Sequence, residues 1–296
     1  MLFNLLKKAD VIGLELGNRD YRFLWMFILW LVFIHLEVFM SQATFLNSIS
    51  EQSSLVDLGS VPSFVDLKAF AEEPFEASAC VNNLDQDPFL TQRRALPLPE
   101  GPVEIGVIQL SSGSGAVTEL VADEFIFTIK GKLSLTQDEP IVLGKSSSLV
   151  LLHGCSFTWH CEETTTLIYM RYNQSTPSDN KIIPINLSAM LEPSGAPLVE
   201  LLVGPMPSCR NHTDYLSFDN QFVCGCWDSS PYHRLAMKYK HYEFMYLLEG
   251  SVTFIDELGR KGTFVEGDVF LVQQGAQCSW ESLEYVKKVY AIFRPA

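Results

Sequence analysis

The chain has little positive charge. Its 296 residues include 21 Lys and Arg against 35 Asp and Glu, which gives a formal net charge of −14 at pH 7. Because nothing in the sequence offers a basic stripe to phosphate groups, the composition argues against a nucleic-acid partner. With 47% hydrophobic and 19% charged residues, it indicates a globular chain that is long enough for two domains of ordinary size.

A regular cysteine framework is also missing. The 7 cysteines are odd in number and irregularly spaced, which argues against a disulfide scaffold in a chain of this length. Cys224 and Cys226 form one C-x-C pair without a second pair, so a zinc site is weakly indicated. On a strand, alternation sends both side chains to the same face, and we interpret them as buried free thiols.

Long helical patterns are absent from residues 242–280. Aromatic and β-branched runs alternate there with Gly, Asp and Glu, a pattern typical of short antiparallel strands joined by tight turns. The pattern occurs twice in the chain, with one gap that falls in a turn, at residues 136–140 in one copy and 256–262 in the other. The repeated positions include Gly106 and Gly225 (225 − 106 = 119), Glu124 and Glu243 (243 − 124 = 119), and Trp159 and Trp280 (280 − 159 = 121). We interpret this as a duplicated β-domain.

These motifs resemble those of a known superfamily. The Glu-x6-Gly stretch at residues 243–250 and the glycine motif at residues 267–275 resemble the two cupin motifs. The Gly-x4-Trp stretch at residues 275–280, preceded by Gly-x-Trp at residues 225–227, resembles the ureidoglycine aminohydrolase-type cupin domain. The resemblance implies a two-domain cupin (bicupin) of the RmlC-like jelly-roll superfamily, and hence an all-β fold with two tandem jelly-roll barrels. It also implies a homodimer, since arms and barrel edges often pair between subunits in this superfamily.

The expected domains follow from these motifs and from changes in composition. They are an N-terminal extension at residues 1–40, a first cupin barrel with an N-terminal arm at 41–172, a linker at 173–197, and a second barrel at 198–296. We expect the arm, residues 41–100, to pack on the first barrel, and residues 63–71 within it have some helical spacing.

The N-terminal extension contains an apolar segment that predicts a helix, with a candidate transmembrane span at residues 21–40. Basic residues precede this segment, and the next one after it is Lys68, which favours a cytoplasmic N-terminus and a single-pass membrane protein. Two alternatives stay open at this point. Either the true start is Met40 and the barrels are cytoplasmic, or the extension is an amphipathic segment of a soluble protein.

The usual metal ligands of cupins are missing from both copies. Metal-binding cupins supply a His-x-His pair, a Glu and a third His, but no His-x-His occurs among the 6 histidines of this chain. The Glu is present at Glu124 and Glu243, while the third-His position falls near Cys278 in the second copy. A divalent metal is therefore expected only in a rearranged site of Glu243, Cys278 and His241, and the alternative is a protein without a metal cofactor.

The second copy is more polar and more aromatic than the first where ligands would sit. Its candidate ligand-binding residues are Trp227, Lys238, Tyr239, Tyr246 and Trp280. We therefore expect a cupin that binds a small polar or carboxylate metabolite in its second barrel. The alternative is a metal-dependent aminohydrolase of the ureidoglycine type, a hydrolase acting on a small ureido or amino compound, that uses Cys278 and has Glu243 as its catalytic residue.

Overall fold

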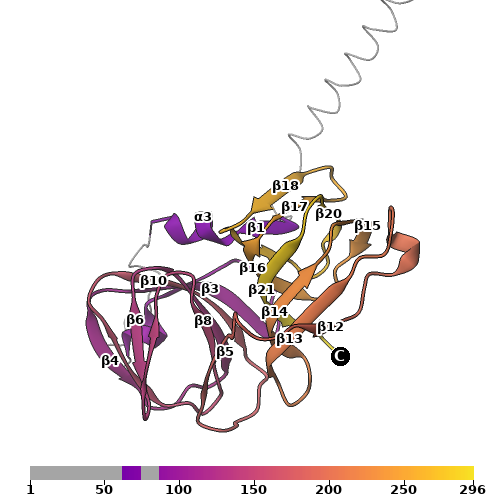
Figure 1. Ribbon diagram of the computed structural model, residues 1–296. Coiled ribbons are helices and arrows are strands. Elements are labelled where there is room, and N and C mark those ends of the chain that lie inside the picture. Colours follow the sequence, from indigo (N-terminus) through magenta and orange to yellow (C-terminus); the bar gives the residue numbers. More distant parts are fainter. Residues whose placement is uncertain (1–61, 75–86) are drawn as a thin grey trace, which may run out of the picture. The chain divides into compact units, whose positions relative to one another are not determined.

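The computed structural model describes residues 62–74 and 87–296 (Figure 1). The chain divides into two units, Met1–Ser60 and Val61–Ala296, and every described residue lies in the second unit. The helix predicted at residues 21–40 lies outside the described residues. Within the described ranges, no helix has the length and apolar character needed to cross a membrane. The two predicted locations of the protein stay predictions.

Two β-barrels make up the described residues, which confirms the prediction of a mostly β fold. The first barrel has a six-stranded sheet, in the order β11-β8-β5-β10-β3-β2, and a four-stranded sheet, in the order β4-β9-β6-β7. The bounds of its strands are β2 Arg93–Ala95, β3 Val103–Leu110, β4 Gly113–Val117, β5 Asp123–Lys130, β6 Leu133–Thr136, β7 Pro140–Leu143, β8 Ser148–Leu151, β9 Phe157–Cys161, β10 Thr165–Tyr172 and β11 Ile182–Pro184.

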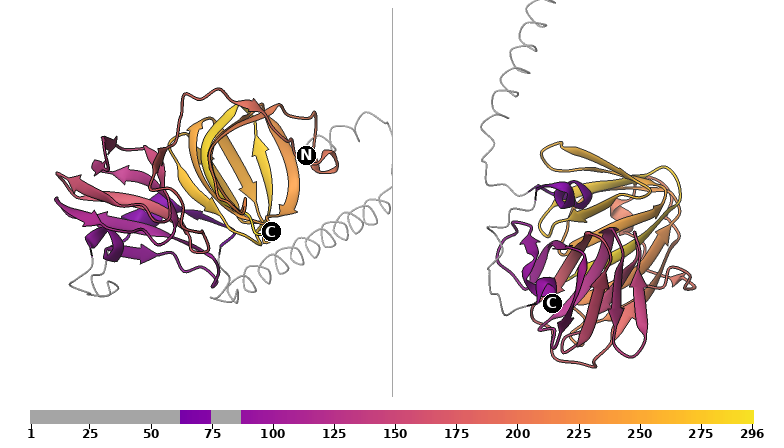
Figure 2. Two further views of the ribbon diagram at one scale, coloured as in Figure 1. Left: turned by 90° about the horizontal axis from the view of Figure 1, so that it is seen from below. Right: turned by 90° about the vertical axis from the view of Figure 1, so that its left-hand side faces the viewer.

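The second barrel repeats this arrangement. Its seven-stranded sheet has the order β1-β19-β16-β21-β14-β13-β12, and its four-stranded sheet has the order β15-β20-β17-β18. Most of its strands appear in orange and yellow in Figure 2, next to the magenta strands of the first barrel. Its strands are β1 Phe64–Asp66, β12 Glu192–Pro193, β13 Cys209–Leu216, β14 Phe222–Ser229, β15 Tyr232–Lys238, β16 Tyr242–Glu249, β17 Ser251–Ile255, β18 Lys261–Val265, β19 Val269–Val272, β20 Gln277–Ser282 and β21 Val286–Phe293. The short helices are α3 Leu67–Glu72, α4 Pro88–Thr91 and the 3₁₀ turn η2 Val199–Leu201.

The strand order confirms the duplication read from the sequence. Strand β5, which carries Glu124, lies between β8 and β10. Strand β16, which carries Glu243, lies between β19 and β21, the equivalent strands of the second barrel. The gap between the two copies falls in the β6–β7 and β17–β18 turns, as predicted. Cys224 and Cys226 share one buried face of β14, and both are free thiols, as predicted.

The arm at residues 41–100 packs only in part as expected. Strand β2 pairs with β3 of the first barrel, as predicted. Strand β1 instead pairs with β19 of the second barrel, in the register Phe64↔Val272, and for this segment the prediction is wrong because β19 offers an edge that needs a partner. The equivalent edge of the first barrel, at β8, is covered instead by β11 from the predicted linker.

The two large sheets share one hydrophobic core. Phe125 and Phe127 of β5 meet Phe244 of β16, with ring centroids 4.9 and 5.5 Å apart. The central strands of each large sheet are therefore buried on both faces, one against this shared core and one against the interior of their own barrel. This explains why β5, β10 and β16 are buried along nearly their whole length rather than at alternate residues.

The hairpin after Glu243 turns at Gly250, and a substitution there tests whether this position requires glycine. Gly250 has φ +79°, and an added Cβ would lie 2.1 Å from the carbonyl oxygen of Tyr285. Gly259 has φ +76° but no atom within 4 Å of an added Cβ. We expect Gly259→Ala to cost the backbone strain alone, about 1 kcal/mol, and Gly250→Ala to cost clearly more, because a steric overlap is added. Urea unfolding of both variants measures this, and equal losses would contradict it.

Candidate functional site

The candidate site lies inside the second barrel and is organised by the alternation along β16. Glu243 and Met245 face the barrel interior, whereas Phe244 and Tyr246 face the core shared by the two large sheets. Glu243 is 7% exposed, so its carboxylate lies in a low-dielectric environment. A buried carboxylate is costly unless it is paired and hydrogen-bonded.

Two side chains satisfy the Glu243 carboxylate. Lys288 Nζ lies 2.7 Å from Oε1, and His241 Nε2 lies 3.2 Å from Oε2. The His241 ring must donate, because an ionised carboxylate only accepts. Burial raises the pKa of Glu243, but the charge of Lys288 and the hydrogen bond from His241 outweigh it and hold the pKa well below its usual value. Glu243 is therefore a weak base.

Lys288 is the residue that the sequence analysis missed. It is 5% exposed, and its ammonium group lies 4.6 Å from the ring centre of Trp227 and 5.1 Å from that of Trp280. The strand register explains the first contact, since Lys288 lies directly opposite Trp227 across the β14–β21 pair. A lysine at an inward-facing position of a mostly apolar strand was the available signal.

A second buried cation, Arg234, was also missed. It is 4% exposed and lies opposite Trp280 in the β15–β20 pair. Its Nη1 donates to the carbonyl oxygens of Leu235 (3.1 Å) and Cys278 (3.3 Å). Among residues 62–74 and 87–296, no carboxylate lies within ion-pair distance of Arg234. Its charge is therefore not neutralised by a carboxylate of these residues.

Tyr239 lies between Arg234 and His241. The side chains of Arg234, Tyr239, His241, Glu243 and Lys288 follow one another in contact and are called the polar chain. The Tyr239 hydroxyl accepts a hydrogen bond from Arg234 Nη2 at 3.2 Å, and the Tyr239 ring lies 5.2 Å from that of His241. His241 contacts Glu243, which contacts Lys288. Burial, the largest influence, raises the pKa of Tyr239, so this hydroxyl is protonated at neutral pH.

Aromatic rings border this polar chain. Trp227 and Trp280 meet edge to face at 5.8 Å, and Tyr232 stacks on Trp280 at 5.5 Å with an interplanar angle of 10°. The structure thus brings together most of the predicted site residues, namely Trp227, Tyr239, His241, Glu243 and Trp280.

Two predicted ligand-binding residues lie elsewhere. Lys238 is exposed. Tyr246 lies on the face of β16 opposite to Glu243, and its ring packs 4.7 Å from that of Phe127 in the first barrel. Position 246 differs from 243 by an odd number, so alternation along the strand already indicated opposite faces.

The donor set does not fit the predicted metal site. Both oxygens of Glu243 already contact Lys288 and His241. Cys278 is fully buried, and this burial raises the pKa of its thiol to about 12, so the thiolate that a metal needs is disfavoured. Within the described part of the chain, no cluster of three His, Cys, Asp or Glu side chains could hold a metal ion.

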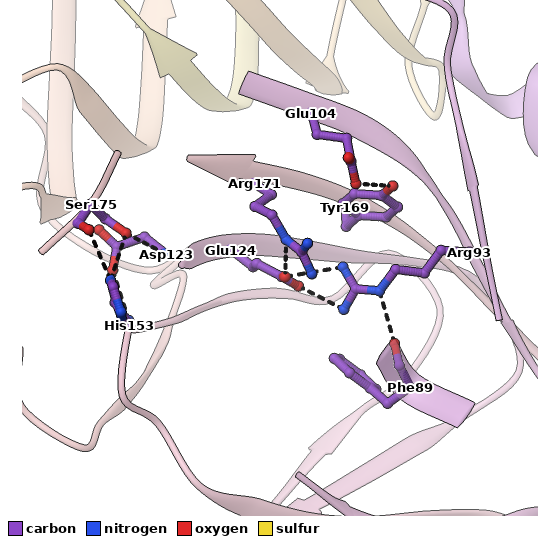
Figure 3. A network of polar contacts seen from close by, with 9 residues as sticks. All are labelled: Phe89, Arg93, Glu104, Asp123, Glu124, His153, Tyr169, Arg171 and Ser175. Carbon is purple, nitrogen blue, oxygen red and sulfur yellow. Dashed lines mark hydrogen bonds and ion pairs between the residues drawn. The ribbon is translucent and has the colours of Figure 1, made fainter. Parts of the chain in front are cut away.

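The first barrel neutralises its equivalent glutamate differently. Glu124 is fully buried, and two arginines hold it: Arg93 through both of its oxygens and Arg171 at 2.6 Å (Figure 3). Burial raises the pKa of Glu124, but the two guanidinium charges outweigh it and hold the pKa below its usual value. Both duplicated glutamates are thus paired with cations of the chain itself.

Comparisons with known proteins agree with this fold. The EutQ-like cupin domain matches residues 216–290. A crystal structure of a DUF861-family protein of unknown function from Pseudomonas syringae pv. tomato is 27% identical, covers 78% of this chain and 100% of its own, and superposes with a TM-score of 0.69. A mutant of salicylate 1,2-dioxygenase from Pseudoaminobacter salicylatoxidans is 11% identical, with a TM-score of 0.50 over 86% of this chain and 93% of its own, and shares the fold alone. A search of curated proteins gave no match.

Removing the cation from Lys288 tests the electrostatics of the site. We expect Lys288→Met to lower the free energy of unfolding at pH 7 by about 3–5 kcal/mol, because Glu243 stays buried without its main partner. The folded-state pKa of Glu243 in the wild type lies below the ordinary 4.5, so this pair adds stability above that pH and loses it in acid. In Lys288→Met the pKa of Glu243 rises, and the loss should shrink as the pH falls towards 4.5 and Glu243 is protonated.

The matched control is the neighbouring lysine. Lys287 is half-buried, and its Nζ donates to the carbonyl oxygen of Leu187 at 3.4 Å without a carboxylate partner among the described ion pairs. Lys287→Met should change stability by no more than about 0.5 kcal/mol at any pH. Denaturant unfolding between pH 4 and pH 8 measures both variants. A pH-independent loss in Lys288→Met would contradict the assignment.

Proposed function

We propose that the second barrel of this chain, which matches a EutQ-like cupin domain, binds a small anionic metabolite through a carboxylate group. The observation that carries the proposal is Arg234, a guanidinium that is 4% exposed and has no carboxylate partner among the described residues. A buried charge without a counter-ion is costly, and an anionic ligand would neutralise it.

The charges around the site favour the same class of ligand. Arg234 and Lys288 contribute two positive charges, and Glu243 contributes one negative charge. The excess is therefore positive. A guanidinium presents paired N–H donors in a plane that matches a carboxylate, so Arg234 suits recognition of this group better than a lysine would.

The aromatic residues indicate a small and partly apolar ligand body. Trp227, Trp280 and Tyr232 form adjoining ring faces and edges next to the two cations. Aromatic side chains with a few placed polar groups are typical of small-molecule sites. The polar chain from Arg234 to Lys288 would fix the orientation of such a ligand.

Binding is favoured over the aminohydrolase alternative by the chemistry of two residues. A general base works best when its pKa lies near the working pH, and the pKa of Glu243 is held well below that range. A thiol with a pKa of about 12, as at Cys278, is a poor nucleophile and a poor metal ligand at pH 7. The homodimer expected from the resemblance stays a prediction.

Thermal unfolding with matched ligands tests the proposal. We expect malonate or succinate to stabilise the wild type, and the corresponding neutral diamides to have no such effect, because the amides lack the charge that Arg234 recognises. A ligand present at about 100 times its Kd should add about 2.7 kcal/mol of stability.

Two variants locate the effect. Arg234→Gln should abolish the stabilisation by carboxylates, whereas Lys238→Gln should retain it, because Lys238 is exposed. Equal responses to acids and amides, or an Arg234→Gln protein that responds like the wild type, would count against the proposal.

A further inference from the structure

The inside of the first barrel holds an arginine that comes from the edge of its sheet. Arg93 lies in β2, a strand of three residues that pairs only with β3, in the register Arg93↔Ile108. Its side chain is nevertheless 8% exposed and reaches the buried Glu124 (Figure 3). The guanidinium group inside the first barrel therefore comes from β2, a short strand that precedes the longer strands of this barrel.

The contacts of Arg93 have the geometry of specific guanidinium recognition. Nη1 donates to Glu124 Oε1 at 3.0 Å, and Nη2 donates to Oε2 at 3.1 Å. Nε donates to the carbonyl oxygen of Phe89 at 2.9 Å. A two-pronged contact with a carboxylate selects a planar fork of donors, which an ammonium group cannot reproduce.

Aromatic rings complete the site. The guanidinium carbon lies 4.7 Å from the ring centre of Tyr169 and 5.4 Å from that of Phe89. The Tyr169 hydroxyl donates to Glu104 at 2.7 Å, which fixes the ring, and Phe89 packs edge-on against Phe157 at 5.2 Å. Stacking of a cation on such rings adds to the attraction by the carboxylate.

The second barrel shows that the fold does not require this arginine. Ile108 and Trp227 are equivalent positions, with the same offset as the two glutamates (227 − 108 = 119). The residue opposite Trp227 is Asn211, which carries no charge. There Glu243 is neutralised by Lys288 from another strand. The guanidinium at Glu124 is therefore particular to the first barrel.

The charges of the cluster around Arg93 balance only when Arg93 is present. This cluster holds the carboxylates Glu104 and Glu124 and the guanidinium groups Arg93 and Arg171, while Asp123 in the same view contacts His153 instead (Figure 3). Without the Arg93 side chain the cluster has an excess of negative charge, and the space between Glu124 and Tyr169 loses its occupant.

We propose that the first barrel is a recognition site for a guanidinium group, that Arg93 of the same chain occupies it, and that a small alkylguanidinium compound binds there once this side chain is removed. The inference is independent of the function proposed for the second barrel. The ligand proposed for the first barrel is a cation, whereas the ligand proposed for the second barrel is an anion.

Rescue of Arg93→Ala in the full chain tests the proposal. Methylguanidinium at low millimolar concentration should raise the Tm of this variant in a saturable manner, while methylammonium and urea should not. The wild type should show no saturable rise, because Arg93 holds the site. Arg94→Ala is the matched control, since Arg94 contacts Glu73 and Phe70 outside the barrel, and it should show no rescue.

A second variant keeps the test decisive. Arg93→Ala combined with Glu124→Gln should lose the response to methylguanidinium, because the carboxylate that accepts two hydrogen bonds from the guanidinium group is gone. If Arg93→Ala does not fold alone, the yield of refolding in the three additives replaces the Tm as the readout. Rescue by methylammonium to the same extent, persistence of rescue in the double variant, or no rescue at all would overturn the proposal.

Discussion

The rest of the structure depends on one constraint: each barrel contains a buried glutamate that must be neutralised. Glu124 and Glu243 occupy equivalent positions on β5 and β16, where the large sheets are covered on both faces. An ionised carboxylate in such a place is stable only with a cation and hydrogen bonds close by. The chain provides these cations itself, as Arg93 and Arg171 in one barrel and Lys288 in the other.

The two solutions have different consequences for function. In the cluster around Glu124 of the first barrel, two guanidinium groups face Glu124 and Glu104, and the charges of these four side chains balance. In the second barrel, Lys288 is sufficient for Glu243, and Arg234 is left without a counter-ion in the described structure. The two copies of the fold thus have interiors of different electrostatic character. We propose anion binding for the second.

Patterns local in sequence predicted much of this, and contacts distant in sequence did not. The repeated glycines, glutamates and tryptophans predicted two copies of one β-fold, and their spacing located the turn in which the copies differ. The cation beside Glu243 is Lys288, which is 45 positions away in the sequence and is placed by strand register. The pairing of β1 with the second barrel was not predictable either, because an edge accepts any chain that reaches it. Tyr246, in contrast, could have been assigned to the shared core from its odd separation from Glu243.

The central claim is that cations of the chain, rather than a metal ion, hold an anion in the second barrel. The most direct measurement is a calorimetric titration of malonate into full-length protein purified in a chelator, repeated after addition of divalent manganese or zinc. We expect malonate to bind with the same affinity to the chelated protein, to the protein with manganese and to the protein with zinc. Binding that disappears in the chelated protein and returns with a divalent ion would contradict it.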